Sequence, residues 1–230
     1  MHHDVRRLTS VEDVAAAAAE VIATVARAAV ADYGVCAIAL SGGRTPRPMF
    51  AALRSCDVPW HATTFFQVDE RVVASTDSAR NLLALREDLA TVPVRWVTMP
   101  VNDPDLERAA ERYGAQLPER FDLVHLGLGT DGHTASLVPG DDVLSVRDRL
   151  VGLTKRYQGY RRMTLTYPAL ARADQLLWIV TGPDKAHALA QLVAGDPAIP
   201  ASHVVARRSL IIADAAATGE TDTTPVEKRQ

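Results

Sequence analysis

The chain carries the segment FDLVHLGLGTDGHTASLVP at residues 121–139, and its two halves differ in character. Its first six residues, 121–126, form an apolar run that is typical of a β-strand. The residues that follow include three glycines, at which the backbone can turn sharply and approach a ligand. Ligands of α/β proteins collect at the carboxyl ends of strands, so Asp131 and His133 lie where we expect a reactive site.

Further apolar runs occur before and after this segment, and helical patterns separate most of them. Predicted strands lie at residues 35–40, 63–68, 94–99, 161–167, 176–180, 203–206 and 209–213. Predicted helices lie at residues 11–31, 49–54, 81–89, 104–116 and 186–193, with a helical turn at 168–173. Ser10 can cap the first helix, and Gly34 can end it. Strands that alternate with helices predict an α/β protein with a mainly parallel sheet.

Length and charge limit the domain count and the class of partner. A chain of 230 residues can bury one sizeable core. We expect one α/β domain over residues 1–217, followed by a disordered polar tail over residues 218–230. With 25 Lys and Arg against 28 Asp and Glu, the net charge of −3 gives no long-range attraction to nucleic acid or to an anionic membrane.

Three features of the sequence predict a cytoplasmic protein. No apolar run approaches the roughly 20 residues that span a bilayer. Residues 1–4 lack a basic region followed by a hydrophobic one, as a signal peptide would have. The two cysteines, Cys36 and Cys56, are too few for a disulfide framework and lack metal-ligand spacing, so we expect both to be reduced.

Residues 127–132 match the pattern G-x-G-x-x-G, which invites a dinucleotide interpretation. A dinucleotide-binding fingerprint continues as an amphipathic helix, whereas Pro139 breaks this continuation, so we expect no nicotinamide cofactor. Asp131 and His133 without a third neighbouring ligand fall short of a metal site. A capped turn, in which Asp131 binds loop N–H groups and His133 is idle, stays open. No G-x-S-x-G elbow occurs, so water is the expected nucleophile of any hydrolysis.

Other strand ends also carry polar or charged groups. Residues 41–46, SGGRTP, follow a predicted strand, so backbone N–H groups and Arg44 can face an anion there. The missing Gly-Lys-Ser/Thr ending excludes a P-loop, and an ordinary glycine turn stays open. The charged residues 69–71 mark either a solvated edge or the rim of a site. Lys185, taken alone, is more often a surface lysine.

If the strands are parallel, these groups meet on one side of the sheet. A single anion-binding pocket around His133 would then be surrounded by Arg44, Arg71, Arg162 and Lys185. The irregular stretch 141–160, rich in charge and glycine, would cover this pocket. His125, which lies inside the central strand, is expected to be a hydrogen-bonded structural histidine.

Together these residues resemble the successive motifs of the 6-phosphogluconolactonases. The matching segments are Ser41-Gly42-Gly43-x-Thr45-Pro46, Asp69-Glu70-Arg71, Gly127-x-Gly129-x-Asp131-Gly132-His133-Thr134-Ala135-Ser136-Leu137-x-Pro139, Arg162-x-Thr164-Leu165-Thr166 and Thr181-Gly182-x-x-Lys185-Ala186. The resemblance spans roughly residues 10–215, and residues 131–137 are its most specific part. It implies a modified Rossmann-like α/β fold, shared with glucosamine-6-phosphate deaminase and ribose-5-phosphate isomerase, with a small additional lid or β element.

The resemblance also implies an activity. It implies hydrolysis of 6-phospho-D-glucono-1,5-lactone to 6-phospho-D-gluconate in the oxidative pentose phosphate pathway, without a metal or another cofactor. His133 would activate water, Asp131 would orient it or the imidazole, and Arg71 would stabilise the oxyanion. The expected substrate-binding residues are Ser41, Gly42, Gly43, Arg44, Thr45, Asp69, Asn81, Gly129, Arg162 and Lys185. The partner would be this sugar phosphate, bound by a monomer or weak homodimer.

The nearest competing enzyme is glucosamine-6-phosphate deaminase, which shares the Asp-Gly-His core. Its pattern usually has a tyrosine where this chain has Arg71, and it continues toward Ile-Ala-Phe-Asn after the histidine. This chain instead reads TASL at residues 134–137. Departures from the lactonase pattern at residues 77–81, Val138 and 155–160 bear on pocket shape and rate more than on reaction type. A sugar-phosphate-binding protein without turnover stays a third alternative.

Overall fold

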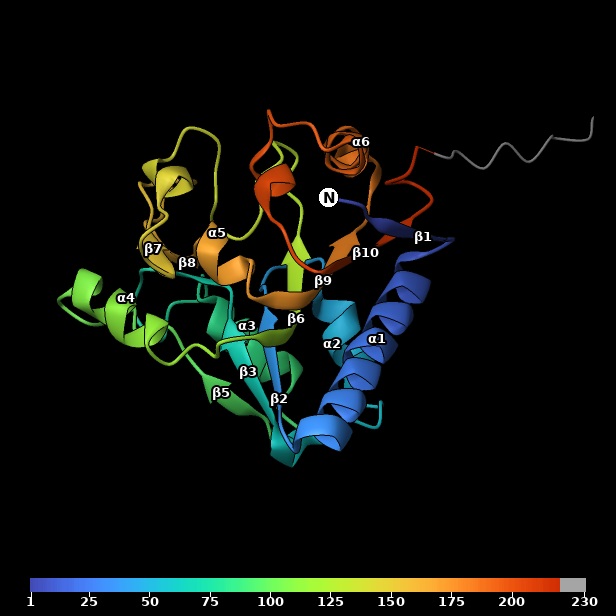
Figure 1. The fold of residues 1–230 in the computed structure, drawn as a ribbon, viewed down its shortest axis with the longest axis horizontal. Coiled ribbons are helices and arrows are strands. Elements are labelled where there is room, and N and C mark those ends of the chain that lie inside the picture. Colours follow the sequence, from blue (N-terminus) through green and yellow to red (C-terminus); the bar gives the residue numbers. More distant parts are fainter. Residues whose placement is uncertain (220–230) are drawn as a thin grey trace, which may run out of the picture.

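The computed structural model describes residues 1–219, which form a seven-stranded parallel sheet with helices on both faces (Figure 1). Across the sheet the strands follow the order β1 (Asp4–Leu8), β10 (Arg208–Asp214), β9 (Ala173–Val180), β6 (Phe121–Gly127), β2 (Cys36–Leu40), β3 (Thr63–Gln67) and β5 (Arg95–Val97). Every neighbouring pair is parallel. The predicted α/β class and parallel sheet are therefore confirmed.

The strand order reverses between β2 and β6. From β2 the chain builds outward through β3 to β5, whereas from β6 it builds in the opposite direction through β9 to β10. The loops that leave β2 and β6 therefore diverge at the carboxyl edge of the sheet. Such a switch point opens a crevice in which α/β proteins bind their ligands.

Apolar side chains on the two faces of the sheet form two separate cores. One core packs against α1 (Val11–Tyr33), α2 (Arg47–Leu53) and α3 (Asn81–Asp88). The other packs against α4 (Leu106–Gly114), α5 (Tyr167–Leu170) and α6 (Ala186–Ala194). Figure 1 shows α1 and α2 on one side of the sheet and α4 and α5 on the other. Adjacent strand residues alternate between the cores, as Ile38 and Ala39 do.

Helix α1 begins and ends as the sequence predicts. Ser10 caps it by accepting a hydrogen bond from the Asp13 backbone N–H, and Gly34 ends it in the left-handed conformation with φ of 78°. Its 23 residues have a mean hydropathy of 1.7 over 18 residues, which is long and apolar enough to span a bilayer. The expectation that no such run exists was wrong. Its alanine-rich face, with Ala18 and Ile22 fully buried, packs in the core of the protein.

A second, antiparallel sheet stands beside the first. It consists of β4 (Asp69–Arg71), β8 (Arg162–Leu165) and β7 (Val151–Leu153), with β8 in the middle. Val68 links the two sheets, because its N–H donates to the Leu40 carbonyl and its carbonyl accepts from the Leu165 N–H. This sheet is the additional β element that the resemblance implied.

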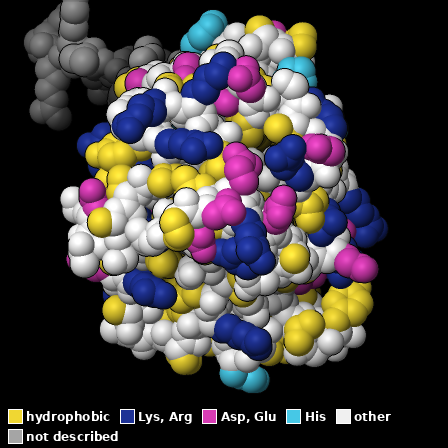
Figure 2. All heavy atoms as spheres, turned by 90° about the vertical axis from the view of Figure 1, so that its left-hand side faces the viewer, with side chains coloured by type: hydrophobic (Ala, Val, Ile, Leu, Met, Phe, Trp, Pro, Cys, Tyr) yellow, Lys and Arg dark blue, Asp and Glu magenta, His cyan; other side chains and the backbone are white. Residues whose placement is uncertain are grey.

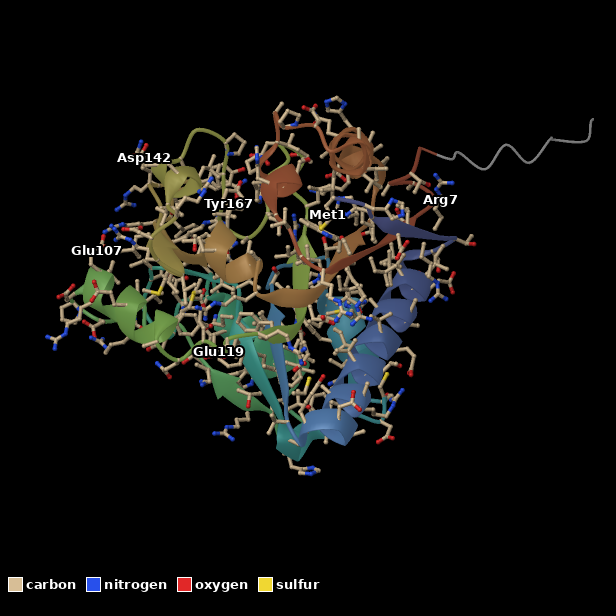
Figure 3. The ribbon with its side chains drawn as sticks, viewed as in Figure 1. Met1, Arg7, Glu107, Glu119, Asp142 and Tyr167 are labelled. Atoms are coloured by element: carbon tan, nitrogen blue, oxygen red, sulfur yellow. The ribbon has the colours of Figure 1, made fainter. Side chains whose placement is uncertain are left out.

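Four short 3-10 helices complete the described chain: η1 (Trp60–Ala62), η2 (Asp142–Ser145), η3 (Pro183–Lys185) and η4 (Pro200–His203). The predicted strand at 203–206 was wrong. His203 is the last residue of η4 instead. At the start of η4, the Pro200 carbonyl accepts a hydrogen bond of 2.9 Å from the hydroxyl of Tyr167, which is labelled in Figure 3. The edge strand β1 was not predicted, because its side chains are mostly exposed and show no apolar run.

Strands β4 and β7 were not predicted either, because residues 69–71 are all charged and β7 lies in the stretch expected to be irregular. The other α-helices and strands lie within a few residues of their predicted positions. Residues 220–230 of the predicted tail lie outside the described residues. On the face shown in Figure 2, Lys and Arg side chains are interspersed with Asp and Glu. This mixture agrees with the small net charge of the chain.

Candidate active site

A pocket opens at the switch point, between the loops that leave β2, β6 and β9. The strands hold these loops together through the ladder between β2 and β6, in which Ala39 pairs with Val124. One step further along, the Ser41 hydroxyl donates to the His125 carbonyl over 3.0 Å. The backbone of the sheet therefore fixes the distance between the first two loops.

The structure brings the predicted site residues together. The pocket is lined by Ser41, Gly42, Gly43, Arg44, Thr45, Asp69, Arg71, Asn81, Gly129, His133, Arg162 and Lys185. Asp131 stands next to them, hydrogen-bonded to the His133 ring. The separate strand ends that the sequence offered thus converge on one cavity.

His133 and Asp131 form a hydrogen-bonded pair at the end of β6. The distance between His133 Nδ1 and Asp131 Oδ1 is 2.5 Å, and the His133 backbone N–H also donates to Oδ1. With Nδ1 occupied by the carboxylate, Nε2 is the nitrogen that is free for a substrate. The His133 side chain keeps 22% of its surface exposed, so it is accessible to solvent.

The Asp131–His133 pair can keep its geometry only with glycine at position 129. A Cβ atom at Gly129 would lie 2.1 Å from His133 Nδ1. The Gly129 N–H donates to the His133 carbonyl over 2.8 Å, which closes the loop on itself. Burial alone would raise the pKa of Asp131, but its hydrogen bonds to His133 and the nearby imidazole hold that pKa below its ordinary value. Asp131 is therefore a carboxylate that orients the ring.

A second polar cluster forms the small-sheet wall of the site, where Asp69, Arg71 and Arg162 of the small sheet meet Asn81 of α3 and Ser136 of the loop after β6. Asn81 donates to Asp69 Oδ1 over 3.1 Å and accepts from Arg71 over 3.2 Å. The Ser136 hydroxyl donates to Asp69 Oδ2 over 2.5 Å, and Arg162 reaches Ser136. Burial raises the pKa of Asp69, although Ser136 and Arg162 oppose the rise.

Glu70 holds this wall in place from behind. Its side chain is fully buried and accepts the backbone N–H groups of Arg71, Asn81 and Leu82. It also accepts from Gln67 and pairs with Arg80 over 3.2 Å. The charged run at residues 69–71 is therefore the rim of the site, with Glu70 buried and paired, rather than a solvated edge.

The arginines reach the pocket by a route that the sequence did not predict. Arg71 and Arg162 are paired opposite each other in the antiparallel sheet, so they do not extend from the edge of the main sheet. The Nε atom of each is buried and has no hydrogen-bond partner among the described residues. These two donors are unpaired in a pocket where an anion could accept from them.

Arg44 and Lys185 come from the main sheet, after β2 and β9 respectively. Arg44 is exposed, and Lys185 pairs with Asp184 at 3.4 Å while 21% of its side chain is exposed. Gly42 lets Asn81 approach, because a Cβ there would lie 2.7 Å from the Asn81 side chain. The loop after β2 therefore contacts the small-sheet wall directly.

His125 differs from its prediction in one respect. It is a buried residue of β6, as expected, and its ring meets Phe50 edge-on at 6.2 Å. Neither ring nitrogen has a hydrogen-bond partner among residues 1–219. Burial lowers the pKa of His125 to about 3, so the ring is neutral. The prediction that this histidine is hydrogen-bonded was wrong.

Sequence reasoning missed three residues near the site. Tyr157 donates to Asp131, Gln158 lines the pocket, and Ser136 bonds to Asp69. Ser136 lies in the quoted motif, so its position was a usable signal. Tyr157 and Gln158 lie in the stretch 141–160, which was expected to cover the pocket but offered no periodic pattern. That the stretch covers the pocket stays a prediction.

Comparison with known proteins places the chain in a family. A family model described as glucosamine-6-phosphate isomerases/6-phosphogluconolactonase matches residues 9–212. The chain belongs to this family. A member from Synechocystis sp., named 6-phosphogluconolactonase, is 37% identical over 180 residues, which are 72% of this chain and 75% of that relative.

Solved structures of the glucosamine-6-phosphate isomerase/6-phosphogluconolactonase family share the fold. A 6-phosphogluconolactonase from Thermotoga maritima superposes with a TM-score of 0.82 at 26% identity, covering 92% of this chain and 99% of that one. A monomeric glucosamine-6-phosphate deaminase superposes with a TM-score of 0.84 at 18% identity, covering 95% and 100%. The second likeness shows the fold alone. Within this family, the fold and membership that the motifs implied are confirmed.

The acidic, histidine and cysteine side chains of the described residues do not cluster as metal ligands. Within residues 1–219, no group of three or more His, Cys, Asp or Glu side chains is arranged to hold a metal ion. The two cysteines are free, Cys36 buried and Cys56 partly exposed, and burial raises the pKa of both thiols. The acidic groups of the pocket instead pair with protein donors such as Ser136 and Asn81.

Proposed function

We propose that this chain is a 6-phosphogluconolactonase, which hydrolyses 6-phospho-D-glucono-1,5-lactone to 6-phospho-D-gluconate. The observation that carries the proposal is the convergence of four cations and an Asp131–His133 pair on one pocket. The family membership and the relatives named 6-phosphogluconolactonase support it independently. Such a pocket suits a substrate with a phosphate at one end and an ester at the other.

His133 is the proposed general base. Its Nε2 removes a proton from water, whose oxygen attacks the C1 carbonyl of the lactone. The carbonyl becomes an oxyanion, and the tetrahedral intermediate then expels the ring oxygen. The imidazolium of His133 returns its proton to that oxygen, which becomes the hydroxyl of the open-chain acid. Asp131 keeps the ring in the correct orientation throughout.

Arg71 is the proposed electrostatic stabiliser of the oxyanion. Its guanidinium is held by the Ala79 carbonyl at 2.6 Å and by Asn81 at 3.2 Å, so it is fixed before substrate arrives. A fixed cation stabilises developing charge without reorganising at the moment of reaction. Asp69 supports this arrangement by binding Asn81 and Ser136.

The phosphate group of the substrate is proposed to lie among the loop residues 41–45, Arg162 and Lys185. A phosphate carries about two negative charges near neutral pH. Charge-assisted hydrogen bonds to it would position the distant C1 carbonyl beside His133, so binding energy is converted into orientation.

The proposal also covers the cellular location, the extent of the domain, its partner and its assembly state. We propose a cytoplasmic enzyme, which the two free cysteines support because disulfides are rare in that compartment. We propose a single domain over residues 1–217, which needs only this sugar phosphate as partner and is a monomer or weak homodimer. Size-exclusion chromatography with light scattering would measure the assembly state.

The test is lactone hydrolysis by the purified protein, corrected for the spontaneous reaction. His133→Ala should lower kcat by about 100-fold or more, because the general base is lost. His61→Ala is the matched control, since His61 is exposed in η1 at the opposite end of β3. Turnover of the His133 variant at the wild-type rate would remove this residue from its role.

The same preparation distinguishes the two alternatives. Ammonia released from glucosamine-6-phosphate would identify a deaminase. Binding of 6-phosphogluconate without turnover of the lactone would identify a silent sugar-phosphate-binding protein. The proposal requires lactone turnover above the spontaneous rate and no ammonia release.

A further inference from the structure

Tyr157 contacts the Asp131–His133 pair from outside the pocket. Its hydroxyl donates to Asp131 Oδ2 over 3.1 Å, while Asp131 Oδ1 faces the His133 ring. The Tyr157 ring meets the His133 ring edge-on, with centroids 5.5 Å apart. Each oxygen of the Asp131 carboxylate therefore has one side-chain partner, the His133 ring on Oδ1 and the Tyr157 hydroxyl on Oδ2.

The backbone holds Tyr157 in this place. Tyr157 and Tyr160 exchange two backbone hydrogen bonds of 2.9 and 3.1 Å across a two-residue turn. The turn residues Gln158 and Gly159 have φ of 48° and 85°, the positive values that a tight type I′ hairpin turn requires. The Arg162 guanidinium lies 5.3 Å from the Tyr157 ring centre and packs against that ring.

We propose that Tyr157 is a positioning residue, which fixes the Asp131 carboxylate and thereby the tautomer and orientation of the His133 ring. The inference rests on the role of His133 in the proposed lactonase reaction. A carboxylate with one free oxygen can rotate and exchange partners with water, since 36% of the Asp131 side chain is exposed. The hydrogen bond from the Tyr157 hydroxyl prevents this rotation. Asp131 Oδ1 therefore stays hydrogen-bonded to His133 Nδ1, and His133 Nε2 stays available as the base.

The hydroxyl suits this task chemically. Burial, followed by the hydrogen bond to Asp131, raises the pKa of Tyr157, so the group keeps its proton and donates it. Besides Asp131, the charged group that packs on the Tyr157 ring is Arg162 of β8, while Arg71 and Lys185 line the same pocket as His133. Tyr157 itself does not line the pocket, unlike its neighbour Gln158. Its loss should therefore change turnover more than substrate binding.

The test is Tyr157→Phe, which removes the hydroxyl and keeps the ring. We expect kcat to fall about tenfold, the usual scale for one hydrogen bond to a charged group at a half-exposed site, with KM changed less than about twofold. Nitrogen-15 NMR of labelled histidine, with the His133 signals assigned by His133→Ala, reports the tautomer directly. We expect the wild type to carry its proton on Nδ1 and the variant to show a mixture of both tautomers.

A second background tests whether the effect passes through Asp131. In Asp131→Asn, the added Tyr157→Phe change should alter neither the tautomer nor kcat further. The control is Tyr33→Phe, a distant tyrosine that is 62% exposed at the end of α1 and should behave as wild type. Circular dichroism checks that each variant is folded.

Two results would overturn the inference. One is a wild-type tautomer and kcat in Tyr157→Phe; the other is an equal loss of kcat with Asp131 intact and with Asp131→Asn. Failure of the proposed function looks different, because wild-type protein would then not hydrolyse the lactone. The NMR measurement would still decide whether Tyr157 holds the imidazole.

Discussion

At the scale of single residues, His125 is a buried polar side chain whose two ring nitrogens form no hydrogen bond with any described residue. Its ring is 1% exposed, packs on Phe50, and has no hydrogen-bond partner among the described residues. Protonation would place a charge on a buried ring that packs on Phe50 and lines the cationic pocket. The folded protein therefore resists protonation there, and burial lowers the pKa to about 3.

This pKa shift predicts how stability depends on pH. Between pH 6.5, the ordinary histidine value, and pH 3, the unfolded chain binds a proton at residue 125 that the folded chain does not bind. The free energy of unfolding therefore falls as the pH is lowered through this window, by up to about 1.4 kcal/mol for each pH unit. Above pH 6.5 neither state binds a proton at residue 125, so His125 no longer makes the free energy of unfolding depend on pH.

The variant His125→Leu should remove this dependence. Urea denaturation between pH 7.5 and 4.5 should show a free energy of unfolding close to wild type at pH 7.5, and an increasing advantage for the variant below pH 6.5. His61→Leu, at an exposed position, should follow the wild-type curve. Parallel curves for wild type and His125→Leu would contradict the assignment. Other acid groups, such as the buried Asp69, cancel in the difference between the two proteins.

At the scale of elements, the turn after β6 carries the Asp131–His133 pair and also packs against η4 and the residue before it, which hold the turn in place. Gly132 has φ of 76°, and a Cβ there would lie 2.4 Å from Ile199. The Gly132 carbonyl also accepts from the Ala201 N–H, which ties the loop to η4. The loop is thus clamped between β6 and η4, so the spacing of Asp131 and His133 is set by packing as well as by sequence.

A methyl group in this loop should reduce activity without unfolding the protein. Gly129→Ala places a Cβ against His133 Nδ1 and Asp131 Oδ1, so the ring must leave its partner. We expect kcat to fall by about 100-fold, as for loss of the base, while stability changes by only about 1 kcal/mol because side chains can move aside. Lactone kinetics and urea denaturation measure the two effects.

Gly114→Ala is the matched glycine control for that experiment. Gly114 ends α4, and a Cβ there would meet its nearest neighbour, Val151, at an ordinary 3.6 Å. Wild-type kinetics are expected for it. If Gly129→Ala kept full turnover, the contact between His133 and Asp131 would not be needed for catalysis.

At the scale of the whole molecule, the cationic groups of the pocket come from three separate parts of the fold. Arg44 follows β2, Lys185 follows β9, and Arg71 and Arg162 come from the small sheet. The main sheet alone would supply only the first two. The link through Val68, which bonds to Leu40 in one sheet and Leu165 in the other, brings the rest into range.

Removing one of these cations should weaken binding of the phosphate group selectively. Lys185→Ala should raise KM for the phosphorylated lactone about tenfold and leave kcat within about threefold, because the lost contact is remote from the carbonyl. Unphosphorylated gluconolactone should show no such change. Lys155→Ala is the control, since Lys155 is exposed and pairs with Asp142 away from the pocket. Equal effects on both lactones would exclude a phosphate site at Lys185.

The sequence by itself determined the parallel sheet, the reactive loop and most of the pocket lining. Apolar runs such as residues 35–40 indicate strands that are buried between two layers of helices. Glycines and charged residues at the ends of these runs indicate the loops at which α/β proteins bind ligands. These are properties of neighbouring residues, so they can be read along the chain. The positions of His133, Arg44 and Lys185 at one edge follow from them.

Only the tertiary structure decided which distant groups meet at that edge. The pairing of β4 with β8 places Arg71 opposite Arg162, and a tight turn aims Tyr157 at Asp131. Neither contact leaves a periodic trace, because both join segments far apart in the sequence through a few hydrogen bonds. The same holds for His125, whose unpaired ring depends on what surrounds it in space and not on its neighbours in the chain.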